Sequence, residues 1–179
     1  MMMTAPSLIA TMTAPSPPDT ASYRKAVAMF ATGIAVVTAM DTNGEVHGAT
    51  VNSFTSISMR PPTVMVSLLP GRAHYLISRS GWYGVSVLSS TQRAHSSHYG
   101  GRYEIEWEPD FVAGHRVATL KDSLARFECH VINEFQVHDH TLFVAQVMAC
   151  NSVDAGDGQP TSPLMFFSSS DRFRLRGDG

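Results

Sequence analysis

Short segments rich in β-branched and aromatic residues follow one another along this chain, and glycine, proline, asparagine and aspartate separate them. Such segments predict β-strands, and their short spacing favours hairpins over the strand–helix–strand alternation of a parallel sheet. We therefore expect a mainly β fold, an antiparallel barrel with peripheral α-helices. The expected strands are residues 34–40, 45–54, 63–69, 82–88, 124–135, 140–150 and 164–167.

The first helix is predicted from an apolar face that recurs between Tyr23 and Phe30. Asp19 and Thr20 are both candidates for its N-cap, because short polar side chains accept a hydrogen bond from the first helical turn. Gly33 is expected to follow its last turn, where a left-handed residue often ends a helix.

Further helices are expected at residues 73–80 and 89–101, and residues 101–123 are expected to be mostly irregular. The pair Asn43-Gly44 predicts a type I′ hairpin turn between the first two strands. Segment 140–150 is apolar at both odd and even positions, so we expect it to be a central strand.

The 179 residues are enough for one compact domain, and 44% are hydrophobic, which permits a substantial core. We expect residues 1–19 to form a mobile tail and residues 20–179 to form a single domain. The net charge of −2 argues against nucleic-acid binding, and no apolar run is long enough to span a membrane. Cys129 and Cys150 are too few for a disulfide framework, so two reduced, buried thiols in a cytoplasmic protein are expected.

Several common catalytic motifs are absent from the sequence. It contains no GxGxxG or GxxxxGK[ST] phosphate loop, no GxSxG nucleophile elbow and no HExxH zinc helix. The eight histidines do not form the convergent set that a metal site needs, so no metal is expected.

Residues 47–62, HGATVNSFTSISMRPP, interleave hydroxyl and amide side chains with apolar ones and end at two prolines. Small polar side chains beside backbone N–H groups can hold a phosphate or the edge of a planar heteroaromatic ring. Hydroxyl-rich strand ends are also ordinary in proteins without a ligand. The residues alone leave both interpretations open.

The order of four segments is more specific than any one of them. YRKAVAMFATGIAVVTA, HGATVNSFTSISMRPPTVMVSL, WYGVSVL and DHTLFVAQV together resemble the NAD(P)H:flavin oxidoreductases of the split-barrel flavin-reductase family, across residues 22–175. The resemblance implies a split β-barrel of the FMN-binding type. It also implies transfer of a hydride from NADH, or NADPH, to FAD or FMN. The reduced flavin would pass to a separate flavin-dependent monooxygenase, and the reductase would be a homodimer.

The resemblance also implies the residues of the flavin site. Residues along the strand and loop after position 49 would meet the flavin ring and ribityl chain, and Arg72 and His74 would lie on its phosphate side. A later segment, which departs from the family pattern, would also approach the flavin. The implied contacts are Thr50, Val51, Asn52, Ser53, Ser67, Leu68, Arg72, His74, His98, Tyr99 and Gly100.

His140 matches a family histidine near the nicotinamide, and the resemblance implies that it orients the reactants or pairs with charge. His138 stands where the family more often has glycine, which we expect to alter the loop. Phe166 and Phe173 would line the flavin or nicotinamide pocket. Two alternatives remain open: another split-barrel enzyme, such as a pyridoxamine-phosphate oxidase-like or haem-degrading protein, and a non-catalytic flavin-binding module.

Overall fold

The structure, a computed structural model, describes residues 16–102, 108–153 and 162–168. Within these ranges it contains three α-helices and eleven β-strands, and every strand pairing is antiparallel. The elements are α1 Thr20–Val27, β1 Thr32–Gly33, β2 Ala35–Met40, β3 Val46–Val51, β4 Thr55–Met59, β5 Pro62–Leu68, α2 Arg72–Ser80, β6 Trp82–Val87, α3 Arg93–Tyr99, β7 Phe111–Ala113, β8 Ala118–Leu120, β9 Ala125–Val137, β10 His140–Ser152 and β11 Met165–Phe166.

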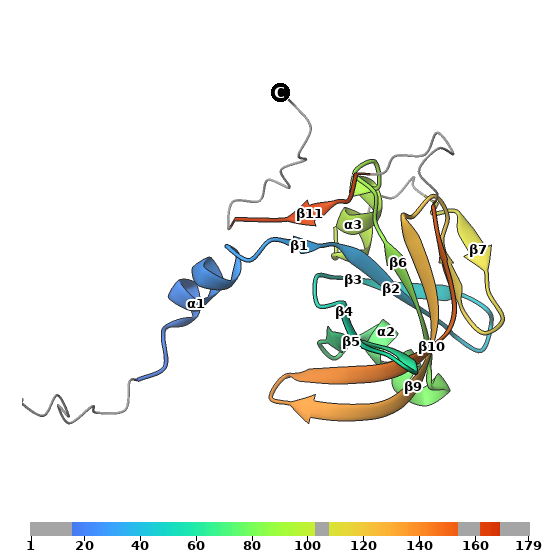
Figure 1. The fold of residues 1–179 in the computed structure, drawn as a ribbon, viewed down its shortest axis with the longest axis horizontal. Coiled ribbons are helices and arrows are strands. Elements are labelled where there is room, and N and C mark those ends of the chain that lie inside the picture. Colours follow the sequence, from blue (N-terminus) through green and yellow to red (C-terminus); the bar gives the residue numbers. More distant parts are fainter. Residues whose placement is uncertain (1–15, 103–107, 154–161, 169–179) are drawn as a thin grey trace, which may run out of the picture.

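A seven-stranded sheet in the order β3-β2-β6-β9-β10-β5-β4 forms the body of the molecule (Figure 1). Strand β10 lies between β9 and β5, as its two-sided apolar sequence predicts. Two further pairs, β1 with β11 and β7 with β8, complete the strand pairing of the described residues. The expected fold class, mainly β and antiparallel with peripheral helices, is confirmed.

The core lies on both faces of strand β2, which is buried from Ala35 to Ala39. Successive side chains of a strand point to opposite faces. Val37 therefore joins the cluster that contains Tyr83 and Phe143, whereas Val36 joins a second cluster with Leu88. This two-sided burial explains why β2 does not alternate: it is apolar except at Thr38, whose buried hydroxyl donates to the Ala118 carbonyl.

Helix α1 begins where the sequence predicts, because the Asp19 side chain accepts a hydrogen bond from the Ser22 N–H at 2.9 Å. The prediction that Gly33 follows its last turn is wrong. The helix ends at Val27, and Gly33 lies in β1, which pairs with β11. None of the eight residues of α1 is buried, and Figure 1 shows this helix standing apart from the sheet, so no core contact extends it.

The hairpin turn after β2 is not of type I′. That type requires a positive φ at both central residues, and within this turn only Gly44 has one, at 84°. The Asp41 carboxylate instead accepts hydrogen bonds from the N–H groups of Asn43 and Glu45, at 2.9 and 3.0 Å. This side chain closes the turn together with two backbone bonds, from the Asp41 N–H to the Glu45 carbonyl and from the Gly44 N–H to the Asp41 carbonyl.

Three other expectations need correction. The strand expected at 45–54 ends at Val51, and β4 starts only at Thr55. The segment 101–123 is less irregular than expected, since β7 and β8 lie within it. Cys129 is buried, but Cys150 is exposed, because that half of β10 extends beyond β5 and pairs with β9 alone.

Within the described ranges, no helix has the length and apolar character needed to cross a membrane.

Candidate functional site

The hydroxyl groups of segment 50–53 fix the backbone between two other elements. Thr50 Oγ1 donates to the carbonyl of Ser96 in α3 at 2.8 Å. Ser53 Oγ accepts from the N–H of Ser67 and donates to its carbonyl, both at 3.0 Å. These bonds tie the loop between β3 and β4 to strand β5. The hydroxyls of Thr50 and Ser53 are therefore already used within the protein.

A cavity of about 470 Å³, here the first cavity, opens beside this loop. Strand β3, the end of β5, the start of α2 and the end of α3 surround it. The residues expected at the site that line it are Thr50, Val51, Asn52, Ser53, Ser67, Leu68, Arg72, His74, Tyr99, Gly100 and His140. A site of this size lies in the range of small-molecule and cofactor pockets.

Glycine at position 48 lets the ring of Tyr99 lie directly on strand β3. A Cβ atom there would lie 2.5 Å from Tyr99 Cδ1 and 2.7 Å from Cε1, well inside ordinary contact. Burial raises the pKa of the Tyr99 phenol to about 12, so this wall of the cavity carries a neutral ring near pH 7. The first cavity therefore has a flat aromatic side.

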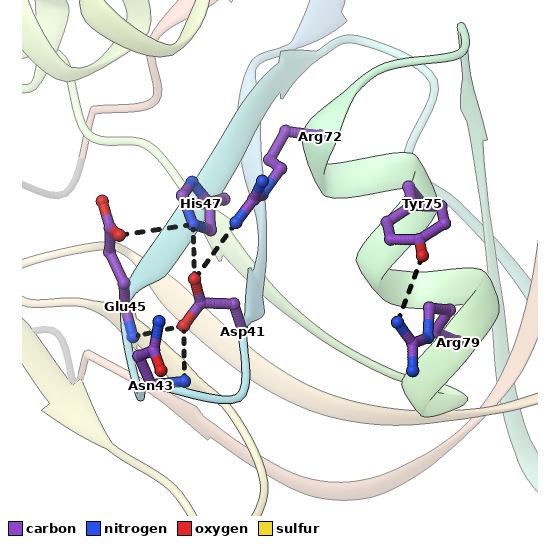
Figure 2. A network of polar contacts seen from close by, with 7 residues as sticks. All are labelled: Asp41, Asn43, Glu45, His47, Arg72, Tyr75 and Arg79. Carbon is purple, nitrogen blue, oxygen red and sulfur yellow. Dashed lines mark hydrogen bonds and ion pairs between the residues drawn. The ribbon is translucent and has the colours of Figure 1, made fainter.

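A charged cluster lies next to the first cavity and contains Arg72, the first residue of α2 (Figure 2). Asp41 Oδ2 lies 3.1 Å from the Arg72 guanidinium and 3.4 Å from His47 Nε2. Burial by itself would raise the pKa of Asp41, but the backbone N–H groups of the turn, His47 and Arg72 together lower it. An ionised Asp41 thus anchors Arg72, whose side chain stays 61% exposed at the cavity.

A second cavity, of about 720 Å³, lies between α1 and the turn that joins β9 to β10. Its lining residues include Tyr23, Arg24 and Val27 of α1 and Leu142 of β10. Ser67 and His140 line both cavities, so the two spaces adjoin at these residues.

The preceding residue, Asp139, orients the ring of His140. Its Nδ1 lies 2.8 Å from Asp139 Oδ1, and because a carboxylate only accepts, Nδ1 carries the proton. This hydrogen bond lowers the pKa of Asp139. His138 has a φ of 53°, so histidine adopts the left-handed conformation expected for glycine. The turn is a two-residue hairpin in which Val137 pairs with His140.

Comparison with known proteins identifies the family. Residues 27–173 match the family described as "Flavin reductase like domain". This chain belongs to the flavin reductase family.

Individual flavin reductases are similar over most of their length. The NADH-dependent flavin reductase StyB of Pseudomonas fluorescens is 51% identical over 152 residues, covering 84% of this chain and 88% of that protein. The styrene monooxygenase flavin reductase (SMOB) from Pseudomonas putida S12 is similar in structure, with a TM-score of 0.79, 46% identity, and coverage of 88% and 99% of the two chains. The flavin reductase PheA2 gives a TM-score of 0.80 at 34% identity, covering 90% of this chain and 100% of that one.

The remaining expected residues are Phe166, His98 and Phe173. Phe166, expected in the flavin or nicotinamide pocket, lines the second cavity from strand β11. His98 is not among the residues that line the first cavity; its ring lies edge-on to that of Tyr99, with centroids 4.9 Å apart. Phe173 lies outside the described residues.

Sequence reasoning missed the α1 side of this flavin reductase. The helical spacing of Tyr23 and Val27 predicted only a helix with an apolar face, and both residues line the second cavity. It also missed Asp41, which was assigned only to a turn. The one available signal was its position at the start of a hairpin, and that does not reveal an ion pair with Arg72, 31 residues away.

Asp41, Glu45 and His47 are the one group in the described ranges with ligand atoms close enough, within 4.8 Å, to hold a metal ion. Asp41 already accepts hydrogen bonds from two backbone N–H groups, and its second oxygen faces His47 and Arg72. The guanidinium of Arg72 would repel a second cation at this oxygen. The group is therefore explained as an ion-pair cluster of the protein itself.

Proposed function

We propose that this chain is the reductase component of a two-component flavin-dependent monooxygenase. It transfers a hydride from NADH to FAD or FMN and supplies the reduced flavin to a separate oxygenase. The observation that supports this most strongly is the junction of the two cavities at Ser67 and His140. Two adjoining sites of this size allow a flavin and a nicotinamide to meet, and two of the relatives, from Pseudomonas fluorescens and a Rhodococcus species, are named NADH-dependent flavin reductases.

The residues of the first cavity suit a flavin. Leu68 and Val51 provide apolar surface, Tyr99 a flat ring, and the loop at 50–53 a backbone that its own hydroxyls hold rigid. Arg72, anchored by Asp41 at the start of α2, is placed to bind the phosphate, since a helix N-terminus and a cation both favour an anion.

The bound flavin and nicotinamide supply the hydride-transfer chemistry themselves. The protein therefore has to bind, orient and enclose them, and orientation alone can contribute up to about 7–11 kcal/mol. His140 lies between the two cavities. Its Nδ1–H donates to Asp139, which leaves Nε2 to contact a reactant. Because the cofactors carry the reaction, the protein needs no nucleophile–base pair.

We propose a homodimer because, in the part of the chain that the structure describes, none of the eight residues of α1 is buried. Tyr23, Val27, Met29 and Phe30 are 45–74% exposed in and just after this helix. Apolar surface of this extent usually marks an interaction site, and a second copy of the chain would cover it symmetrically. Light scattering coupled to size exclusion is expected to give twice the chain mass of 19.4 kDa. A mass of one chain would contradict the proposal.

The domain extent and the cellular location are also proposed. Residues 20–179 would act as one domain after a tail of residues 1–19. A cytoplasmic location fits the unpaired state of Cys129 and Cys150.

The function is tested by mixing the purified protein with NADH and free FAD or FMN and following NADH absorbance. Flavin-dependent loss of NADH is expected, and its absence would exclude the proposal. Oxidation of pyridoxamine phosphate without NADH would identify a different split-barrel enzyme. Tight flavin binding without turnover would identify a non-catalytic flavin carrier.

A further inference from the structure

A chain of hydrogen bonds runs from the first cavity to the turn between β9 and β10. His74 Nε2 lies 2.8 Å from Thr141 Oγ1, and Thr141 Oγ1 lies 2.9 Å from Gln136 Oε1. At the other end of the same amide, Gln136 Nε2 donates to the carbonyl of His138 at 2.8 Å. The sheet register makes this chain possible, because Gln136 and Thr141 are directly opposite each other on β9 and β10.

The direction of each bond in this chain is determined by chemistry. A backbone carbonyl only accepts, so the nitrogen of the Gln136 amide faces His138, and the oxygen must face Thr141. Gln136 Oε1 also only accepts, so Thr141 donates its single hydroxyl proton to Gln136. Thr141 can then only accept from His74. His74 Nε2 therefore carries a proton in every protonation state compatible with these contacts.

A fixed Nε2–H decides what His74 can offer a ligand. In the neutral ring, Nδ1 is left as the acceptor, which suits an N–H or hydroxyl donor of a flavin better than its phosphate. The ring is further held edge-on against Phe143, with centroids 5.2 Å apart. Within the first cavity, the neutral His74 is thus an acceptor and Arg72 is the anchored cation.

The other half of the amide acts on the second cavity. The carbonyl that Gln136 binds belongs to His138, the residue with a φ of 53°. Such a conformation costs energy for a non-glycine residue, and it persists only where other contacts support it. The same turn leads into His140, which lines both cavities.

We propose that Gln136 is a positioning residue of this reductase: through Thr141 it fixes the proton of His74 on Nε2, which leaves Nδ1 as the acceptor in the first cavity, and through the His138 carbonyl it holds the turn that presents His140. One exposed amide would thus orient a histidine in the flavin site and a histidine at the junction with the nicotinamide site. The kinetic part of this proposal rests on the proposed placement of flavin and nicotinamide. The tautomer part does not.

The tautomer is measured by ¹⁵N NMR of the histidine rings, with the His74 signals identified by their loss in His74→Gln. The wild type is expected to show protonated Nε2 and unprotonated Nδ1 at a pH where the ring is neutral. Thr141→Val removes the acceptor while keeping the side-chain shape, and mixed tautomers are expected. Thr141→Ser is expected to restore the wild-type pattern. An unchanged pattern in Thr141→Val would overturn the proposal whatever the enzyme's function.

Kinetics then separate the two roles of Gln136. Thr141→Val is expected to raise the KM for flavin about five- to tenfold, the effect of one lost hydrogen bond, and to leave the KM for NADH unchanged. Gln136→Glu still accepts from Thr141 but cannot donate to His138, so it should keep the tautomer and raise the KM for NADH instead. Gln136→Leu should raise both. If all three variants have both KM values of the wild type, the positioning role is wrong.

Ser78→Ala is the matched control. Ser78 of α2 donates to Glu134 of β9 at 3.0 Å. Ser78 lies one helical turn from His74, and Glu134 lies two residues from Gln136. Its removal tests whether any weakened contact between these elements changes the KM values. We expect Ser78→Ala to leave both KM values and the His74 tautomer as in the wild type. A rise in flavin KM equal to that of Thr141→Val would assign the effect to general loosening and overturn the proposal.

Discussion

Replacement of Gly48 by alanine places a methyl group against the ring of Tyr99. The added Cβ would lie 2.5, 2.7 and 3.1 Å from three ring carbons, whereas ordinary contact begins at 3.4 Å. The ring must therefore move by about 1 Å in a packed environment, and overpacking of this kind typically costs about 1–3 kcal/mol. Alanine in a strand also gains about 0.5–1 kcal/mol over glycine through the unfolded chain. We expect Gly48→Ala to lower the free energy of unfolding by about 0.5–2 kcal/mol.

The prediction is tested by urea denaturation followed by tryptophan fluorescence, at one protein concentration because a dimer would make stability depend on it. Tyr99→Ala removes the ring, so Gly48→Ala in that background should stabilise the protein instead. Gly33→Ala is the matched control, since Gly33 also lies in a strand and has nothing within 4 Å of an added Cβ. If Gly48→Ala destabilises equally with and without Tyr99, the steric reasoning is wrong. Flavin titration of the single variant should also show weaker binding, because Tyr99 lines the first cavity.

Three further predictions follow from other contacts. Ser53→Ala leaves the N–H and carbonyl of Ser67 without their partner, and urea denaturation should show a loss of about 1–3 kcal/mol together with a higher KM for flavin; wild-type values for both would contradict it. The pKa of Asp41 is lower in the folded protein than its usual 3.8, so its contribution to stability is complete above that pH and is lost as the pH falls further. Urea denaturation should therefore show wild type more stable than Asp41→Asn at neutral pH, with the difference shrinking below pH 3.8; a difference independent of pH would contradict it. Cys150 should react with a thiol reagent in the native protein, and Cys129, which is buried and whose pKa is raised to about 12, only on unfolding; two fast thiols would contradict this.

The strands were predictable because their signals are local. β-branched runs such as Ala35–Met40 and Pro62–Leu68 determine strand type without reference to the rest of the chain. The N-cap at Asp19 is likewise a contact between near neighbours. The errors had two causes. The Asp41 side chain formed local bonds to the turn that the Asn-Gly pattern does not reveal, and α1 ended early because no core lies against it.

For the candidate site, the sequence indicated most of the lining residues but not the role of their hydroxyl groups. The family resemblance indicated eleven residues that the structure gathers around the first cavity. The hydroxyls of Thr50 and Ser53, however, bind Ser96 and Ser67 and hold the loop in place. Neither partner lies near in sequence, so composition could not show that these groups support the site's shape.

The α1 wall of the second cavity and the anchoring of Arg72 by Asp41 had no sequence signal specific enough to find them. Both depend on how separate elements meet in space. The same holds for Gln136, whose amide contacts are set by the register of β9 against β10.

The central claim is that one flavin and one nicotinamide meet where the two cavities adjoin. A crystal structure with FAD or FMN and NAD⁺ bound tests it most directly. We expect the flavin ring in the first cavity beside Leu68 and Tyr99, and the nicotinamide entering from the second cavity past α1, with Ser67 and His140 between them. Flavin bound outside the first cavity, or a nicotinamide that does not approach His140, would contradict the account.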